Sequence, residues 1–151
     1  MTRPVPQPSP LSAPYWEAAR HGRLELQRCG RCRRYIHFPD FLCPTCGSDD
    51  LRFESVDGHG RIDAFTVVHR VFVPGFEQDA PYAVGWVLLD AQPGLRVFAG
   101  LADVPRDRLA IGLPVSACFT EREGWGLMLG FTPDDAIPVS ATNSREAPDE
   151  P

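Results

Sequence analysis

The chain has 151 residues, of which 43% are hydrophobic and 23% charged, and its formal net charge is -5. That balance is typical of a globular protein with one domain or two small units packed together. The negative charge argues against a general nucleic-acid binder, which needs a basic face, and no apolar run approaches the roughly 18 residues of a membrane span.

Residues 1–13 are rich in proline and serine. A segment of this composition cannot bury a core, so we expect a disordered leader. The leader also lacks the apolar stretch of a secretory signal. We therefore expect a cytoplasmic protein, in which thiols stay reduced.

The next stretch, residues 13–22, predicts a short helix with Ser12 as its cap, Pro14 in its first turn and Gly22 at its end. A helix with a bulky apolar side must bury that side against something. Two interpretations stay open: the helix packs on its own domain, or it docks a partner chain. The apolar side is formed by Tyr15, Trp16 and Ala19.

Four cysteines form two pairs with the Cys-x2-Cys spacing: Cys29, Cys32, Cys43 and Cys46. Two such knuckles complete a tetrahedral thiolate cage around zinc, and four thiolates leave no coordination position for water. The sequence therefore predicts a structural, rubredoxin-like zinc ribbon over residues 14–55, a unit that needs the metal in order to fold. An iron site and disulfides are the alternatives. We expect Cys118 to be a structural thiol.

Residues 56–133 alternate between apolar and polar positions in five predicted strands, at 61–73, 82–89, 95–101, 115–119 and 125–131. The link at 104–112 has room for one helical turn that plugs a barrel. Five strands with an element between the third and the fourth predict an OB-type barrel, with a sandwich fragment as the alternative. The fold class is thus mainly β, with a helix and a ribbon before the barrel. Residues 134–151 are polar and acidic, which predicts a disordered tail.

Charge is distributed unevenly along the chain. Residues 20–34 hold six arginines against one glutamate, whereas residues 57–135 hold six arginines against eleven acids. The ribbon arginines partly neutralise the negative thiolate cage, or they recognise phosphate or an acidic partner. The sequence contains no lysine, which excludes lysine Schiff-base chemistry, and it shows no phosphate loop, HExxH or Gly-x-Ser-x-Gly motif. We expect no catalytic constellation in this chain.

Several pieces, taken in order, resemble a known family. They are the helix with Tyr15-Trp16, the run from Gly22 to Cys32, the second knuckle followed by Gly47, and Gly58-His59-Gly60-Arg61-Ile62. The combination is similar to the acyl-CoA-associated zinc-ribbon and OB-fold family, long catalogued as domain of unknown function 35. The resemblance covers roughly residues 14–132.

The resemblance implies a non-catalytic accessory subunit in lipid, steroid or polyketide metabolism. Its partner would be a thiolase-superfamily enzyme, such as a thiolase, a steroid side-chain aldolase or an acyltransferase, with a MaoC-type hydratase as a further possible partner. The implied ligands are structural zinc on the four cysteines and acyl-CoA. The family's docking helix matches Tyr15, Trp16 and Ala19.

Coenzyme A carries phosphates and an extended arm. For the phosphates the candidates are Arg31, Arg33 and Arg34. For an acyl groove on the barrel the candidates are Phe72, Phe76 and Trp86, beside the long loop at 74–81. Two other functions stay open: a nucleic-acid-binding ribbon and barrel module, and a stand-alone acyl-CoA thioesterase that uses His59, His69 or Cys118.

Overall fold

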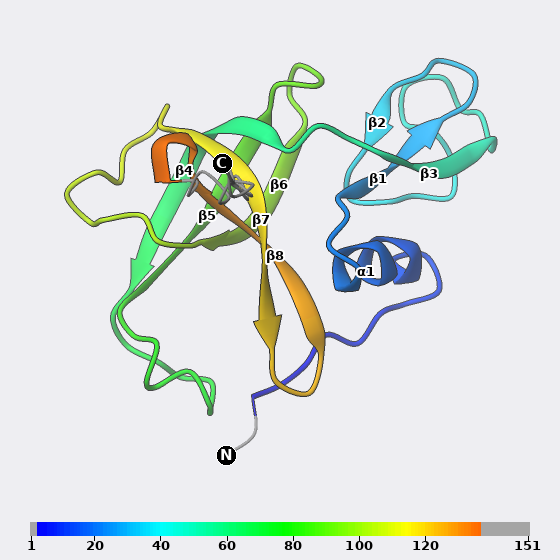
Figure 1. Cartoon of the computed structure of the whole chain (residues 1–151). Helices are drawn as coiled ribbons and strands as arrows, with labels where there is room; N and C mark the ends of the chain where they lie inside the picture. Colours follow the sequence, from blue (N-terminus) through cyan, green and yellow to red (C-terminus); the bar gives the residue numbers. More distant parts are fainter. Residues whose placement is uncertain (1–2, 137–151) are drawn as a thin grey trace, which may run out of the picture.

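The computed structural model describes residues 3–136. A small ribbon lobe and a closed five-stranded barrel lie side by side, and the N-terminal helix lies below the ribbon and against the barrel's last hairpin (Figure 1). The predicted class, mainly β with one N-terminal helix, a four-cysteine cluster and an OB-like barrel, is confirmed. None of the helices in the described range has the length and apolar character that a membrane crossing requires.

Helix α1 spans Ala13–Arg20 and ends as the sequence predicts. Gly22 adopts a φ of 71°, a left-handed conformation that costs glycine little. Its N–H donates to the Ala19 carbonyl, and the following N–H, from Arg23, donates to the Ala18 carbonyl. These paired bonds satisfy the last carbonyls of the helix, so the glycine sets where it stops.

The start of the helix differs from the prediction. Ser12 occupies the cap position but makes no side-chain bond to the helix. Its hydroxyl instead accepts the N–H of Ser9 at 3.0 Å. The capping prediction for Ser12 is therefore wrong, because a closer donor in the leader takes the hydroxyl.

The ribbon is a three-stranded antiparallel sheet in the order β2-β1-β3. Its strands are β1 (Glu25–Cys29), β2 (Tyr35–Ile36) and β3 (Leu51–Ser55). The first knuckle forms the turn between β1 and β2, and the second lies on the connection from β2 to β3. This places both cysteine pairs at one end of the small sheet.

The barrel closes in the order β4-β5-β6-β8-β7, with β7 pairing back onto β4. Neighbouring strands are antiparallel except β6 and β8, which are parallel, and this is the arrangement of an OB fold. The short helix η1 (Asp134–Ala136) follows the last strand. The strands are β4 (His59–Val68), β5 (Tyr82–Leu89), β6 (Arg96–Leu101), β7 (Pro114–Arg122) and β8 (Gly126–Pro133).

The observed strand boundaries in the barrel differ from the prediction by up to five residues, and only β5 matches at both ends. The first strand ends at Val68, five residues early, because the following residues pair with no strand. Trp125 lies in the hairpin turn between β7 and β8. The link at 104–112 does hold one hydrogen-bonded turn, as predicted: the Leu109 N–H donates to the Pro105 carbonyl at 3.1 Å, and Leu109 packs against the barrel core.

Ribbon and barrel share one hydrophobic core. Leu24 and Leu26, at the start of the ribbon sheet, are buried among barrel residues such as Ile62, Val97 and Phe131. Each fully buried side chain of this size contributes about 1.5–3 kcal/mol relative to exposure. The two units are therefore packed as one body.

Both ends of the described range make contacts with the barrel. The composition of the leader predicts disorder, but from Arg3 onward this segment contacts the loop between β4 and β5 of the barrel. Within the predicted tail only η1 is described, where Asp135 pairs with Arg108 at 2.7 Å. The prediction for residues 137–151 lies outside the described residues.

The close approach of β4 to its neighbours predicts a specific cost for one added methyl group. A Cβ on Gly60 would run into the carbonyl oxygen of Leu88 on β5, whereas a Cβ on Gly100 would meet open space. We expect Gly60→Ala to lower the unfolding free energy by about 2 kcal/mol, the usual cost of an overpacked site. The matched control, Gly100→Ala, should stay within about 0.5 kcal/mol. Urea denaturation measures both, and equal stabilities would contradict the close approach.

A candidate zinc centre and the aromatic surface beside it

The four knuckle cysteines come together at one point. Their sulfur atoms all lie within 4.8 Å of one another, and the Cys29–Cys46 and Cys32–Cys43 sulfurs are each 3.6 Å apart. A zinc ion bonded to four thiolates at about 2.3 Å places its ligands about 3.8 Å apart. The cysteines therefore fit a four-coordinate zinc, and all four positions are taken by protein sulfur.

Backbone amides favour the thiolate form within the first knuckle. The N–H of Cys32 donates to the Cys29 sulfur at 3.4 Å. This bond is the largest of several that together lower the pKa of Cys29 to about 6 against the opposing effect of burial. Cys29 and Cys43 are buried, and Ile36 and Leu51 pack around them. The dry side of the cage thus faces the small ribbon core.

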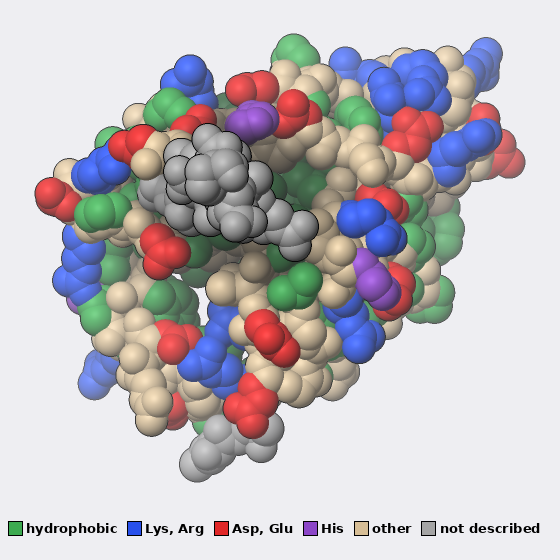
Figure 2. All heavy atoms as spheres, in the orientation of Figure 1, with side chains coloured by type: hydrophobic (Ala, Val, Ile, Leu, Met, Phe, Trp, Pro, Cys, Tyr) green, Lys and Arg blue, Asp and Glu red, His purple; other side chains and the backbone are tan. Residues whose placement is uncertain are grey.

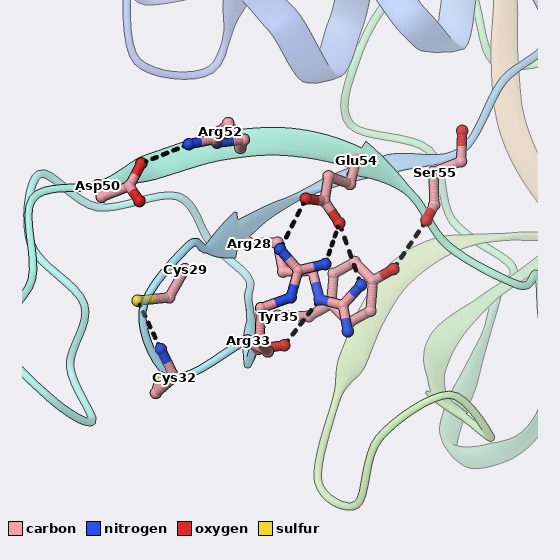
Figure 3. Close-up of polar contacts among 9 residues, drawn as sticks. All are labelled: Arg28, Cys29, Cys32, Arg33, Tyr35, Asp50, Arg52, Glu54 and Ser55. Carbon is pink, nitrogen blue, oxygen red and sulfur yellow. Dashed lines mark hydrogen bonds and ion pairs between the residues drawn. The ribbon is translucent and has the colours of Figure 1, made fainter.

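The three arginines predicted to bind phosphate differ in their contacts: Arg33 is paired with a carboxylate, and Arg31 and Arg34 are not paired within the described residues. Arg28 and Arg33 both pair with Glu54, at 3.0 and 3.2 Å (Figure 3). The hydrogen bond from Arg28 is the main reason that the pKa of Glu54 lies below its usual value. Arg31 and Arg34 are exposed and make no ion pair within residues 3–136. Figure 2 shows that arginines gather over the ribbon lobe.

Two glutamine side chains act as short pieces of β-ladder. The buried Gln27 amide donates to the Asp40 carbonyl at 2.8 Å and accepts the Asp40 N–H at 2.9 Å. Gln92, from the barrel, donates to the Tyr35 carbonyl at 3.1 Å and accepts the Tyr35 N–H at 2.8 Å. Gln27 therefore fixes the loop between the knuckles, and Gln92 fixes the ribbon against the barrel.

The loop between the knuckles contributes to an exposed aromatic surface on the molecule. We define this aromatic surface as Phe38, Trp86 and Phe98. The Trp86 ring lies 6.1 Å from Phe38 and 5.3 Å from Phe98, edge-on to both. Trp86 and Phe98 are cross-strand partners on β5 and β6, whereas Phe38 comes from the ribbon loop. Phe38 is 66% exposed and Phe98 46%. Phe41 and Leu42, on the same loop, are exposed as well.

The predicted docking helix packs inward. Ala19 is only 2% exposed, and Tyr15 contacts the barrel core, where burial raises its pKa to about 12. Trp16 lies edge-on to Trp125 of the hairpin turn, with ring centres 5.7 Å apart. The structure thus shows the first of the two interpretations, packing on the chain's own domain. Ala19 is thus buried, whereas Tyr15 and Trp16 are half-buried, and a docking role for this helix stays a prediction.

The predicted acyl groove is not formed by its three residues. Trp86 belongs to the aromatic surface, Phe72 is exposed on the loop after β4, and Phe76 lies against Tyr82, with ring centres 6.1 Å apart. No aromatic contact within the described residues joins Trp86 to either phenylalanine. The sequence pointed to neither Phe38 nor Phe98, although three large apolar residues so close together in so small a lobe, Phe38, Phe41 and Leu42, were a usable signal.

The groups considered for a thioesterase lie apart. His59 Nδ1 lies 2.7 Å from Ser116 Oγ, but the serine hydroxyl donates to Asp134, so its proton is not directed at the histidine. His69 is exposed on the loop after β4. Cys118 faces Gly130, and burial raises the pKa of its thiol. Among the described residues, His59, His69 and Cys118 thus form no hydrogen bond with one another.

Comparison with known proteins identifies the family. Residues 16–52 match the rubredoxin-like zinc ribbon domain of ChsH2, and residues 54–120 match the ChsH2 C-terminal OB-fold domain. The chain is 32% identical over 104 residues to a DUF35 domain-containing scaffold protein of Pyrococcus furiosus, an alignment that covers 67% of this chain and 72% of that protein. The chain belongs to the DUF35 family.

Two longer relatives also align with this DUF35 chain. A probable enoyl-CoA hydratase alpha subunit of Thermomonospora curvata is 35% identical over 113 residues, covering 75% of this chain and 34% of that protein. The 3-oxo-4,17-pregnadiene-20-carboxyl-CoA hydratase alpha subunit of Mycobacterium tuberculosis is 27% identical over 132 residues, with coverages of 86% and 40%. The DUF35 chain thus spans only 34% to 40% of the length of these two relatives.

Solved structures agree with the DUF35 assignment. A chain of an Ltp2-ChsH2(DUF35) aldolase superposes with a TM-score of 0.77 at 32% identity, covering 85% of this chain and 98% of that one. A DUF35 protein of unknown function from Sulfolobus solfataricus gives a TM-score of 0.55 at 13% identity, covering 83% and 87%. The second likeness concerns the fold alone.

The zinc centre can be tested with a cysteine outside the cage as its control. We expect Cys43→Ser to lower bound zinc from about one ion per chain to near zero and to lower the Tm, because metal binding supplies the folding free energy of the ribbon. Cys118→Ser should leave the metal content unchanged. Elemental analysis and thermal melts measure both. Full zinc content in Cys43→Ser would show that the four sulfurs do not form the site.

Proposed function

We propose that this chain is a non-catalytic subunit that binds a thiolase-superfamily enzyme and an acyl-CoA thioester in the cytoplasm. The observation that carries the proposal is the aromatic surface formed by Phe38, Trp86 and Phe98. Large apolar side chains that are exposed together mark contact sites for other proteins, and aromatic anchors dominate the binding energy of such sites.

The preformed state of this surface supports a docking role. The hydrogen bonds of Gln27 hold the ribbon loop in place, and the β5–β6 pairing holds the other two rings. A surface that is already ordered loses little conformational entropy when a partner binds. The rings therefore supply contact area at low cost.

The partner class comes from the relatives. One solved relative is named as an aldolase of two components, Ltp2 and ChsH2(DUF35), and two sequence relatives are named as alpha subunits of CoA-thioester hydratases. A chain in which cysteine sulfur takes all four positions of the metal site fits the non-catalytic member of such an assembly. Lipid, steroid and polyketide thioesters are the corresponding substrates, and a MaoC-type hydratase is a second partner.

Two arginines remain as candidates for the phosphates of coenzyme A. Arg31 and Arg34 are exposed on the ribbon, whereas Arg33 is paired with Glu54. A guanidinium group binds a phosphate through two parallel hydrogen bonds. We propose that the unpaired two bind the phosphates and that Arg33 serves the ribbon sheet.

The docking proposal predicts a loss of affinity on removal of one ring. We expect Phe38→Ser to weaken binding of the thiolase-superfamily enzyme encoded nearest to this chain by about 30-fold, the effect of losing a contact worth about 2 kcal/mol. Ile111→Ser removes another exposed apolar side chain, on the link before β7, and serves as the control. Titration of each separately purified variant into the purified enzyme, followed by calorimetry, measures both affinities. No complex with wild-type chain, together with salt-sensitive binding of single-stranded DNA, would favour the nucleic-acid alternative instead.

The phosphate proposal predicts a separate effect on coenzyme A. We expect the double variant Arg31→Gln, Arg34→Gln to weaken CoA binding by about tenfold or more, because two charge-assisted contacts are lost. Arg23→Gln is the matched control, since Arg23 is exposed on the same lobe but already pairs with Glu25 at 2.9 Å. Titration of CoA into each purified protein gives the answer. Equal CoA affinities for the wild type, the double variant and Arg23→Gln would show that these ribbon arginines do not bind CoA.

A further inference from the structure

The N-terminal leader meets the long loop that joins β4 to β5, residues 69–81. The Arg3 Nε donates to the carbonyl oxygen of Gly75, and another guanidinium nitrogen of Arg3 lies 2.8 Å from the Asp79 carboxylate. Gly75 has a φ of 92°, and a Cβ at this position would overlap Arg3. The loop backbone is thus shaped to receive this arginine.

A second arginine reaches the same loop from the barrel. Arg122, near the end of β7, lies 3.6 Å from the Asp79 carboxylate. The Phe76 ring faces both guanidinium groups, 5.0 Å from Arg3 and 5.6 Å from Arg122. One carboxylate and one ring of the loop therefore each contact two cations that lie far apart in the sequence.

We call the contacts of Arg3 and Arg122 with Phe76 and Asp79 the clamp. The leader continues from this clamp along the hairpin of β7 and β8 (Figure 1). Val5 lies beside Gly124 in the hairpin turn. Pro8 lines a cavity of about 340 Å³ together with Trp16 of α1 and Trp125 of the turn. The segment thereby connects three elements: the loop, the hairpin and the helix.

Little else holds the loop. Within residues 69–81 the backbone bonds are local: the Asp79 N–H donates to the Phe76 carbonyl at 3.1 Å, and the Gly75 N–H donates to the Glu77 side chain at 2.8 Å. The tip carries Phe72, which is 83% exposed, and the exposed Val73. Loops of this length without strands of their own are uncommon in compact domains and are usually functional or mobile.

We propose that the leader is a strap that sets the mobility of the 69–81 loop through Arg3, and with it the presentation of Phe72 and Val73. A single exposed ion pair contributes little, but here one guanidinium makes a backbone hydrogen bond, an ion pair and a ring contact at once. The clamp orders the loop as long as the leader is bound. All of these contacts lie within one chain, so the strap does not depend on an enzyme partner.

Hydrogen exchange of the backbone amides in the full chain tests the strap. We expect Arg3→Gln to speed exchange at residues 70–80 by about tenfold, the effect of losing charge-assisted bonds. Asp79→Asn, which removes the carboxylate that both arginines contact, should give the same local increase. Arg3→Lys should fall between Arg3→Gln and the wild type, because lysine keeps the charge but loses the planar fork.

The control is Arg108→Gln, which removes an exposed ion pair with Asp135 elsewhere on the barrel. It should leave exchange in the loop unchanged. If Arg3→Gln leaves the loop as protected as in the wild type, or speeds exchange equally across the barrel strands, the strap is refuted. An increase confined to the loop in Arg3→Gln and Asp79→Asn supports it.

Discussion

The closure of four sulfurs around one point is the constraint on which the rest of this structure depends. The two knuckles bracket residues 33–42, so the metal centre closes this segment into a loop at both of its ends. A ribbon of this size has too small a core to order such a loop by itself. Gln27 then fixes the middle of the loop by pairing with Asp40. The exposure of Phe38, Phe41 and Leu42 is thus a consequence of the thiolate cage.

The aromatic surface also requires that ribbon and barrel keep one relative placement. Its rings come from both units, with Phe38 on the ribbon and Trp86 and Phe98 on the barrel. Leu24 and Leu26 enter the barrel core, and Gln92 bonds to the backbone of Tyr35. These contacts make the two units one body, so the three rings keep fixed positions relative to one another.

Arginine serves two different purposes in this chain. In two places a pair of arginines shares one carboxylate: Arg28 and Arg33 at Glu54, and Arg3 and Arg122 at Asp79. A planar guanidinium group suits such shared contacts and also lies well on aromatic faces. These four are structural. Arg31 and Arg34 have no such partner among the described residues, which is why the proposal for a phosphate contact rests on them.

The sequence by itself determined the metal centre and the order of the strands. Ligand spacing is a local property, and so is the alternation of apolar residues, which is why the cysteine cluster and the existence of the five barrel strands, though not all their boundaries, were predicted correctly. Only the tertiary structure decided which side chains are exposed. The fold buries Ala19 and packs Tyr15 against the barrel core, and it brings Phe38 of the ribbon against Trp86 of the barrel. Such pairings join residues distant in the chain, and no local pattern records them.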